Sequence, residues 1–290
     1  MLRIARVQAF LAVIVGALVL GGSSSAVAEG SSDVAALQVA LRSQGLYSGS
    51  VDGFLGPETT GALVEFQRGA GLEPDGVAGP ATRSALGQLG GPELGARTIE
   101  LGAAGWDVAE LQFLLAWRGF PSGTIDGTFG TRLEAAVRRY QRYAGLLVVG
   151  FAGPATVAAL SGPQSLPALS LARPVEAALG DGFGPRRNAF HAGLDFLAAA
   201  GTPVGAAAPG LVTFAGPSPG GWGNLVVVAH GDGVRTLYAH LATVELAVGD
   251  RVAIGGVVGR VGATGRASGP HLHFEVRVRG AAVDPLTALS

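Results

Sequence analysis

The first half of the chain contains the same sequence twice, and this repeat restricts the folds open to its 290 residues. Residues 33–86 align with residues 107–160 without a gap, at a constant separation of 74 positions. The identical positions include Asp-Gly and Gly-Pro turn formers as well as apolar residues. Such a period predicts two tandem copies of one small domain, which we place at residues 32–90 and 106–162.

Each copy has the pattern of a small helical domain. In copy one, Val34, Leu37 and Leu41 follow a helical apolar period. Pro57 suits the first turn of a second helix, and a short third helix is expected to end near Leu86. The sequence therefore predicts two all-α, three-helix units. Units of this size bury little surface alone, so packing between them is expected.

The composition changes after a Gly/Pro-rich stretch, and we assign residues 163–171 as a linker. From there on, short β-branched runs are separated by Gly and Pro, which predicts an all-β barrel or sandwich at residues 172–290. The expected strands are 211–214, 224–229, 234–239, 251–254, 257–261 and 271–277. The chain is thus predicted to be multidomain, with two helical repeats before one β-domain.

The N-terminus has the features of an export signal. Arg3 and Arg6 precede residues 9–22, which carry no charged or polar side chain, and Ala26-Val27-Ala28 follows as a cleavage site. We predict a signal peptide at residues 1–28 and a secreted or cell-wall-associated, extracytoplasmic protein without a membrane span in its mature form. The alternative is an uncleaved anchor, but a spanning helix needs about 20 apolar residues.

The overall composition excludes several other classes of protein. A formal charge of -1 gives no basic surface for nucleic acid. The absence of cysteine excludes disulfides, thiolate metal sites and a cysteine nucleophile.

The 5 histidines of the chain all lie in the predicted β-domain. In an extended segment His191 and Asp195 would share one face, as would His271 and His273. Two histidines and one aspartate leave a fourth coordination position open, which is typical of catalytic zinc. The histidine left over from the His-x-His pair would serve proton transfer or oxyanion stabilisation. Spacing alone does not decide which one it is. His230, in an Ala-His-Gly-Asp-Gly turn, is interpreted as structural.

The repeats resemble the peptidoglycan-binding domain found on many wall hydrolases. The resemblance is carried by the pattern D-G-x-x-G-x-x-T, followed by a glutamine and G-x-x-G-P-x-T, and it implies peptidoglycan as the partner. Copy two departs from copy one at Leu133, which replaces Thr59, and at Val149, which replaces Asp75. Whether copy two binds is therefore left open.

The β-domain resembles the lysostaphin/LytM-type zinc endopeptidases, whose fold is of the duplicated hybrid motif type. The resemblance is carried by Phe-Gly-Pro-Arg before residue 187, H-x-x-x-D, Tyr-Ala-His-Leu and His-Leu-His-Phe-Glu. It implies that His191, Asp195 and His273 hold one Zn²⁺ per chain. It also implies that His240 and His271 assist catalysis. Arg186 either positions substrate or braces the fold.

The sequence therefore predicts a secreted zinc metalloendopeptidase that cuts peptide cross-links or stem peptides of bacterial peptidoglycan, with the repeats as wall tethers. The alternative is a non-catalytic, wall-bound regulator that activates another hydrolase; the complete ligand set favours the enzyme. The short stretch from Arg187 to His191 predicts an open groove, although a repeat folding over the groove is left open.

Overall fold

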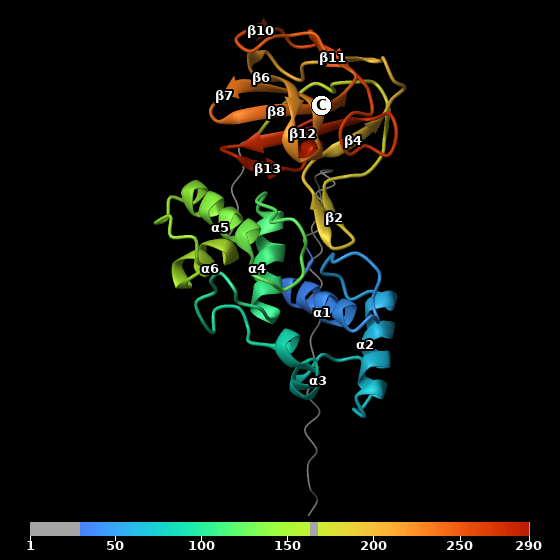
Figure 1. Ribbon diagram of the computed structural model, residues 1–290, viewed down its shortest axis with the longest axis vertical. Helices are drawn as coiled ribbons and strands as arrows, with labels where there is room; N and C mark the ends of the chain where they lie inside the picture. Colours follow the sequence, from blue (N-terminus) through green and yellow to red (C-terminus); the bar gives the residue numbers. More distant parts are fainter. Residues whose placement is uncertain (1–29, 163–167, 290) are drawn as a thin grey trace, which may run out of the picture.

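A computed structural model describes residues 30–162 and 168–289 (Figure 1). The predicted signal peptide and residues 163–167 of the predicted linker lie outside these ranges. Within them, no helix combines the length and apolarity needed to cross a bilayer. The predicted multidomain fold class is confirmed, since helices fill the N-terminal part and an antiparallel β-domain follows.

The helical part contains three α-helices in each repeat. Copy one forms α1 (Ser32–Ser43), α2 (Pro57–Gly69) and α3 (Pro80–Ala85), followed by the 3-10 helix η1 (Gly87–Gly90). Copy two forms α4 (Trp106–Trp117), α5 (Thr131–Tyr143) and α6 (Pro154–Ser161). Proline occupies the first turn of α2, α3 and α6, where its missing N–H is not needed.

A buried glutamine fixes each Asp-Gly turn of copy one. Gln38 Nε2 donates to Asp52 Oδ1 at 2.7 Å, and Gln38 Oε1 accepts from the backbone N–H of Gly53 at 2.9 Å. Gln67 repeats this arrangement with Asp75 and Gly76. The two turns of the domain thus have the same construction, and a side-chain amide in each satisfies backbone groups in the interior.

Copy two keeps this construction despite the two substitutions in its motif, Leu133 and Val149. Gln112 Nε2 donates to Asp126 Oδ1 at 3.0 Å and to the Thr128 carbonyl at 3.2 Å, so the hydroxyl lost at Leu133 is not required. Gln141 Oε1 accepts from the backbone N–H groups of Val149 and Gly150, each at 3.0 Å. The substitutions therefore change hydrogen-bond partners and leave the fold of the copy intact.

The two repeats pack against each other through α1 and α4. The Trp106 ring is fully buried, its Nε1 donates to Asp33 Oδ1 at 3.0 Å, and the Arg83 guanidinium lies 4.3 Å from the ring centroid. Burial of one large aromatic ring between the copies supplies the shared packing that units of this size need.

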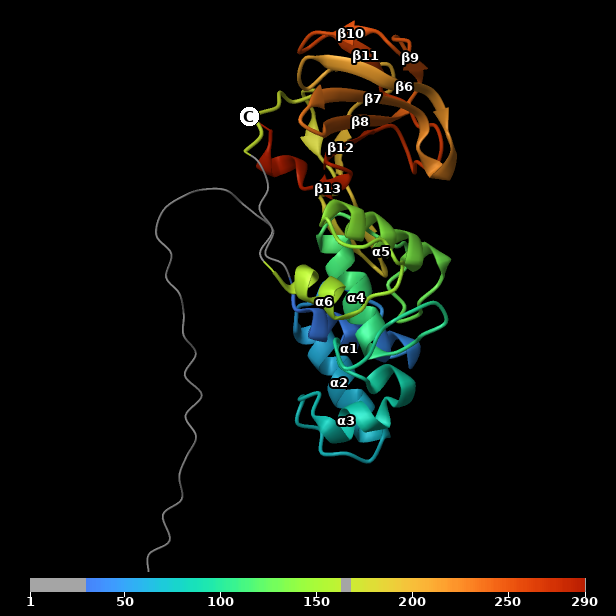
Figure 2. The same cartoon turned by 90° about the vertical axis from the view of Figure 1, so that its left-hand side faces the viewer.

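The β-domain consists of antiparallel sheets (Figure 2). The largest sheet has eight strands in the order β1-β4-β12-β8-β7-β6-β10, with β13 paired to β12. A second sheet has the order β5-β11-β9, and β2 pairs with β3. The bounds are β1 (Ala178–Leu179), β2 (Gly184–Arg186), β3 (Ala189–His191), β4 (Leu194–Leu197), β5 (Pro203–Gly205), β6 (Gly210–Ser218), β7 (Gly223–Gly231), β8 (Val234–Leu241), β9 (Thr243–Val244), β10 (Arg251–Val252), β11 (Val257–Arg260), β12 (Leu272–Val278) and β13 (Ala281–Val283), with 3-10 turns η2 (Pro219–Gly221) and η3 (Pro285–Thr287).

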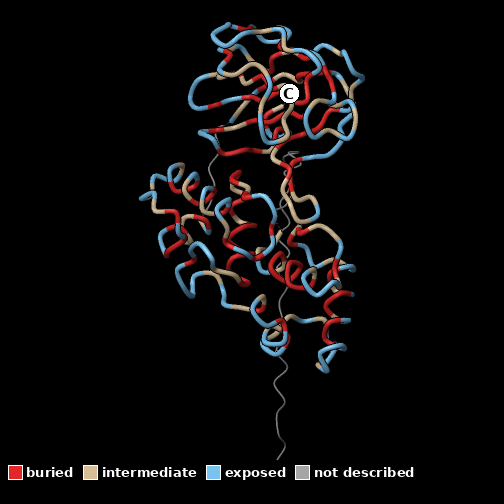
Figure 3. The backbone as a smooth tube through the Cα atoms, in the orientation of Figure 1, coloured by how far each residue is buried: buried red, intermediate tan, exposed pale blue. Residues whose placement is uncertain are grey.

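The core of the β-domain lies between the large sheet and the β5-β11-β9 sheet. Phe196 of β4, Phe274 of β12 and Val258 of β11 belong to one fully buried cluster. Figure 3 shows buried segments along the central strands and exposed segments at the peripheral turns. Because β4 and β12 are anchored on one side by this core, their opposite faces hold side chains in fixed positions.

The β2–β3 hairpin joins the β-domain to both repeats, as Figure 1 shows. At its turn, the Arg187 carbonyl accepts from Val51 N–H and the Asn188 carbonyl accepts from Ile125 N–H. Val51 and Ile125 are equivalent positions, 74 residues apart. Trp117 packs edge-on against Phe183, which directly precedes β2, and against Phe190 of β3 (the pairs of ring centroids are 6.4 Å and 5.4 Å apart). The hairpin turn therefore lies between the two copies.

Candidate metal and active site

A cavity of about 580 Å³ opens on the face of the β-domain that is opposite its core. Four of the five histidines line it, together with Asp195 and Trp222. Pro121 and Gly123 of copy two also line it. The cavity is therefore bounded by two different domains.

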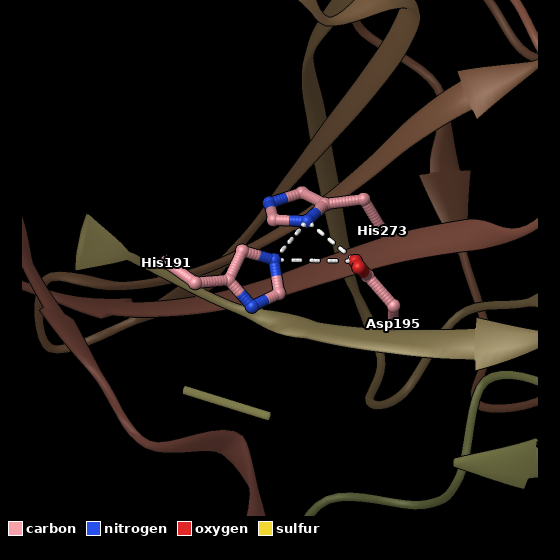
Figure 4. Close-up of side chains that lie close together, drawn as sticks. All are labelled: His191, Asp195 and His273. Carbon is pink, nitrogen blue, oxygen red and sulfur yellow. Dashed lines mark hydrogen bonds and ion pairs between the residues drawn. The ribbon is translucent and has the colours of Figure 1, made fainter. Parts of the chain in front are cut away.

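His191, Asp195 and His273 converge in this cavity (Figure 4). Their nearest donor atoms are His191 Nε2, Asp195 Oδ1 and His273 Nδ1, which lie 2.8 to 3.2 Å apart. All three residues are buried. Among the described residues, this is the one group of three acidic or histidine side chains whose ligand atoms are close enough to hold one ion.

Strand register explains why Asp195 and His273 meet. β4 and β12 are antiparallel neighbours, and His273 is the direct cross-strand partner of Asp195, so both side chains leave the same face. His191 comes from β3, and the chain bends at Gly193 before β4 begins. A Cβ at Gly193 would lie 2.5 Å from the Phe274 carbonyl oxygen and 2.9 Å from the His273 ring. Only glycine leaves enough space for this close approach to β12, which brings His191 to the other two.

The donor set fits zinc. In a tetrahedral site with bonds of about 2.0–2.1 Å, the donor atoms lie about 3.3 Å apart. The observed spacings of 2.8, 2.9 and 3.2 Å are close to this value. Two imidazoles and one carboxylate are ligand types that zinc prefers, and three protein ligands leave one position for water or substrate.

In each histidine ligand, the ring nitrogen that faces away from the cluster is also hydrogen-bonded. The Nδ1–H of His191 donates to the Gly182 carbonyl at 2.7 Å, and the Nε2–H of His273 donates to Glu275 Oε1 at 3.3 Å. Glu275 also accepts from Arg277 Nε at 2.7 Å. With a cation bound, these contacts would leave the lone pairs of His191 Nε2 and His273 Nδ1 facing it, in place of the protons that these atoms share with Asp195 when no cation is present.

The charges of the cluster support its use as a cation site. Burial opposes ionisation of Asp195, but hydrogen bonds from His191, His273 and Arg186 outweigh burial and hold its pKa well below the usual range. Burial lowers the pKa of His273, but Asp195 and Glu275 outweigh it and raise this pKa to about 9. The negative charges that stabilise a proton on His273 would equally stabilise a metal ion in its place.

His240 reaches the cavity through a β-bulge. Between the pairs Val226–Tyr238 and Asn224–Leu241, β8 contains one more residue than β7. Ala239 is the cross-strand partner of His273, so regular alternation would point His240 to the opposite face. Its φ of 61° lies in the left-handed region that non-glycine residues rarely adopt. The bulge turns the imidazole toward the cluster, as bulges beside active sites commonly do.

His240 and His271 lie beside the cluster with one ring nitrogen each engaged by the backbone. The Nδ1–H of His240 donates to the Thr264 carbonyl at 2.8 Å, and that of His271 donates to the Gly269 carbonyl at 2.9 Å. Their ring centroids are 4.8 Å apart. Burial lowers the pKa of His240, which favours the neutral ring. Each ring therefore has an Nε2 available for a reacting group.

Arg186 and His230 differ in their relation to the cavity. Arg186 Nη2 donates to Asp195 Oδ2 at 2.7 Å and also contacts Asp181 at 3.0 Å. It therefore touches a candidate ligand directly. His230 contacts the Pro209 carbonyl and the Thr236 hydroxyl at 2.8 Å and 2.7 Å. It does not line the cavity, and it lies within β7, next to the last residue of the strand, so the turn in which the sequence placed it begins only after Gly231.

Sequence reasoning missed several residues of the site. Glu275 and Arg277 were given no role, although they follow His273 at alternate positions of one strand and so share its face. Trp222, whose ring centroid is 5.4 Å from that of His273, carried no sequence signal. Pro121 and Gly123 could not be found by any pattern within the β-domain, because they belong to copy two.

Comparison with known proteins agrees with this description. Residues 189–285 match the model of "Peptidase family M23", and residues 30–86 and 105–160 match that of "Putative peptidoglycan binding domain". The DD-carboxypeptidase/endopeptidase Mpg of Neisseria meningitidis is 50% identical over 97 residues, which are 33% of this chain and 22% of that protein. The peptidoglycan DD-endopeptidase ShyA of Vibrio cholerae is 41% identical over 103 residues, 36% of this chain and 24% of that protein.

A solved structure is also similar in sequence to the β-domain. The catalytic domain of the antimicrobial peptidase lysostaphin from Staphylococcus simulans is 36% identical over 38% of this chain and 90% of that domain, with a TM-score of 0.36. The similarity to Mpg and ShyA covers less than a quarter of the length of each of these two proteins. On the family matches and the shared residues, the chain carries a peptidase family M23 domain preceded by two peptidoglycan-binding domains.

Proposed function

We propose that this chain is an exported zinc metalloendopeptidase that hydrolyses peptide bonds in peptidoglycan. The observation that carries the proposal is the convergence of His191, Asp195 and His273 on one point inside an open cavity. We assign these three residues as ligands of one zinc ion per chain. The relatives Mpg and ShyA, which share about a third of this chain, are endopeptidases by name.

We further propose that the target is a peptide cross-link or stem peptide. The two repeats support this substrate, since they match a peptidoglycan-binding domain and would raise the local concentration of wall polymer around the cavity. The A-V-A motif at residues 26–28 supports export to the compartment where this polymer lies. Pro121 and Gly123 support an arrangement in which copy two limits access to the cavity from one side.

The residues of the cavity have separable roles in this proposal. Zinc, when bound, supplies Lewis acidity that polarises a carbonyl group and acidifies water. His240 and His271 present Nε2 atoms on one side of the ligands, where they would accept a proton from the attacking water or donate to the tetrahedral oxyanion. Their backbone hydrogen bonds fix the rings, so little reorganisation is needed during the reaction.

Arg186 has a positioning role in this scheme. Its guanidinium donates a hydrogen bond to Asp195 Oδ2, which leaves Oδ1 as the ligand atom. The same guanidinium lines the cavity, so it would also contact a substrate carboxylate. Loss of Arg186 would therefore affect both ligand geometry and substrate binding.

The test uses purified sacculi and the mature chain. The zinc-loaded protein should release fragments with new amino termini, and a chelator should stop this release. His273→Ala should abolish release and lower the zinc content. His230→Gln is the matched control, because it removes a histidine of the same domain that lies outside the cavity, and it should keep both zinc and activity.

Two results would contradict the proposal. Sacculi left uncut by the zinc-loaded protein would remove the enzymatic assignment. Undiminished cutting by a folded His273→Ala protein would show that the cluster is not the reaction centre. Mass spectrometry of the released fragments identifies the bond that is cut.

A further inference from the structure

A cavity of about 380 Å³ lies where copy two meets the β-domain, apart from the cavity with the metal cluster. Three arginines from the two domains line it, together with two aromatic residues and a glycine. The lining residues are Phe120, Arg139, Arg142, Tyr143, Arg279 and Gly280. No aspartate or glutamate is among them, so the lining carries positive charge only. We call this cavity the arginine pocket.

The contact between the two domains holds the walls of the arginine pocket together. The backbone N–H of Ala282 donates to the Gly119 carbonyl at 3.1 Å, and Ala281 is fully buried in the apolar core of copy two. Arg279 directly precedes this contact, in the turn between β12 and β13. Figure 2 shows α5, which carries the other two arginines, beside β13. The guanidinium groups of both domains are therefore kept close to each other.

The three arginines of the pocket lack negative partners. Arg139 Nη2 donates to the Pro121 carbonyl at 3.1 Å, and the Arg279 guanidinium lies 5.0 Å from the centroid of the Tyr143 ring. Neither of these arginines nor Arg142 has a carboxylate within ion-pair distance in the described part of the chain. The whole chain has 20 basic and 21 acidic residues, so this gathering does not reflect a general excess of positive charge. All three arginines are exposed, so an anion in solution can reach them.

A further cation close to the pocket adds to the local charge. Partial burial lowers the pKa of Arg139, and the nearby Arg277 guanidinium lowers it further. Arg277 has its own partner, Glu275, at 2.7 Å, and the pocket arginines have none. Like charges held near each other repel, and an anion placed between them removes this repulsion.

The position of Arg279 is costly for the backbone. Val278 pairs with Ala281, so Arg279 and Gly280 form a two-residue turn, with φ angles of 52° and 92°. In a turn with two positive φ angles the first position favours asparagine, aspartate or glycine. A longer side chain in this conformation adds strain, which commonly occurs where a side chain serves a function. Here the strained turn directs a guanidinium over Tyr143, at the wall of the pocket.

Copy one has no counterpart of the arginine pocket. Glu65 stands where copy two has Arg139, and Gly69 stands where it has Tyr143. The turn glutamines and Asp-Gly pairs that the copies share lie elsewhere in each repeat. The pocket is therefore a feature of the copy that contacts the β-domain, and the shared binding motif does not create it.

We propose that the arginine pocket binds the phosphate groups of an anionic wall polymer in which polyol units are joined by phosphodiesters. A carboxylate has two oxygens in one plane, which one guanidinium can engage alone, whereas tetrahedral phosphate presents oxygens to several guanidinium groups. The volume of about 380 Å³ leaves room for a phosphate and the units beside it. Only the placement of the chain in the compartment of this polymer rests on the proposed function.

The shape of the pocket favours a polymer over a lipid surface. The arginines surround a hollow between two domains, and Phe120 is only 2% exposed, so this ring does not project toward a bilayer. Arg139 bonds to Pro121, which lines the cavity with the metal cluster. A polymer bound in the arginine pocket would therefore pass along the rim of that cavity, and it would retain the chain on walls that carry phosphodiesters.

The test measures binding to a soluble poly(glycerol phosphate) oligomer. The mature chain is titrated calorimetrically with this oligomer at low ionic strength, where charge interactions are least screened. Arg139→Gln and Arg142→Gln should each weaken binding by about 10-fold, the loss expected for one charge-assisted hydrogen bond. Arg279→Asn should weaken binding similarly, and asparagine suits the left-handed turn, so this variant keeps the fold.

The matched control is Arg68→Gln. Arg68 is exposed and is the equivalent of Arg142 in copy one, so its loss changes the net charge by the same amount outside the pocket. Binding by this variant should equal that of the unsubstituted chain. Inorganic phosphate should displace the oligomer at concentrations where sodium chloride of the same ionic strength does not, because the pocket recognises phosphate and not charge alone.

Four results would overturn the inference. The oligomer fails to bind at millimolar concentration, or Arg68→Gln weakens binding as much as the pocket variants do. Sodium chloride displaces the oligomer as well as phosphate does, which would indicate general screening. The chain binds vesicles of anionic phospholipid through these arginines but does not bind the oligomer. None of these measurements involves hydrolysis, so the pocket stands or fails independently of whether the chain cuts sacculi.

Discussion

Replacement of Glu275 by glutamine tests how much the buried acid contributes to the metal site. Glu275 is 1% exposed and accepts hydrogen bonds from His273 Nε2–H and Arg277 Nε–H. Its negative charge makes the His273 ring a stronger donor to a cation at Nδ1. Glutamine has nearly the same shape and keeps an oxygen that accepts from His273, so Glu275→Gln removes the charge and leaves the packing.

The expected magnitude follows from this contact. Loss of an outer partner of a histidine ligand typically lowers metal affinity by about 10- to 100-fold, which is about 1.4–2.7 kcal/mol. The distance of 3.3 Å is long for a charge-assisted hydrogen bond, which favours the lower end of this range. Arg277 loses its carboxylate partner too, but its side chain is 34% exposed and keeps access to water.

Competition with a chromophoric chelator measures the change in zinc affinity. Glu245→Gln is the matched control, because Glu245 is also a carboxylate of the β-domain paired with an arginine, at 2.8 Å, but lies away from the cavity. Urea unfolding of both proteins without zinc checks that the fold is kept. Equal zinc affinity of the folded Glu275→Gln protein and the unsubstituted chain would refute the assigned role.

Three further predictions concern the bend, the repeats and the contact between domains. Gly193→Ala should lower zinc affinity and activity and destabilise the β-domain by about 1–3 kcal/mol, since its Cβ would meet the Phe274 carbonyl oxygen. The control is Gly182→Ala, which should have little effect on thermal unfolding because no atom lies within 4 Å of the new Cβ. Glu110→Gln should stabilise the repeats increasingly as pH rises. Burial raises the pKa of Glu110 above its usual 4.5, so the folded state binds this proton more tightly than the unfolded state. The unsubstituted chain therefore loses stability as pH rises through the folded pKa. Urea unfolding at pH 4.5 and pH 7 measures the difference between the two proteins, and an equal effect of the substitution at both pH values would contradict the reasoning. Trp117→Ala should destabilise the contact between copy two and the hairpin by about 3 kcal/mol and make the Arg187–Asn188 turn sensitive to protease, whereas Trp117→Phe should keep most of the packing.

Features set by local sequence could be predicted. The helices of the repeats follow from apolar periodicity and from proline in their first turns, and α1 and α2 occur where these signals place them. The long strands β7, β8 and β12 also overlap the expected runs. Strands such as β2, β3 and β5, with three residues each, were missed because so few residues show no alternation between two faces.

The residues of the candidate site also fall into those whose placement follows from local sequence and those whose placement does not. The family resemblance assigned Asp195 and His273 to one metal site, but their cross-strand pairing depends on β4 and β12 being neighbours, which the sequence did not predict. The approach of His191 depends on the bend at Gly193, and that of His240 depends on one extra residue in β8. Neither a bend nor a bulge has a period that sequence inspection can detect, so geometry at these two points required coordinates.

Under the proposed function, the contacts between domains would let the repeats do more than tether the enzyme to the wall. A flexible tether raises local substrate concentration without selecting an orientation. Here the hairpin that carries Arg186 and His191 is hydrogen-bonded at its turn to equivalent positions of both copies, Val51 and Ile125. Under the proposed function, a wall strand held by the repeats would therefore have a fixed orientation relative to the candidate metal site. It follows that geometry, more than tether length, decides which peptide bonds reach the cavity, and that weakening the Trp117 contact should broaden the set of bonds cut without abolishing cutting.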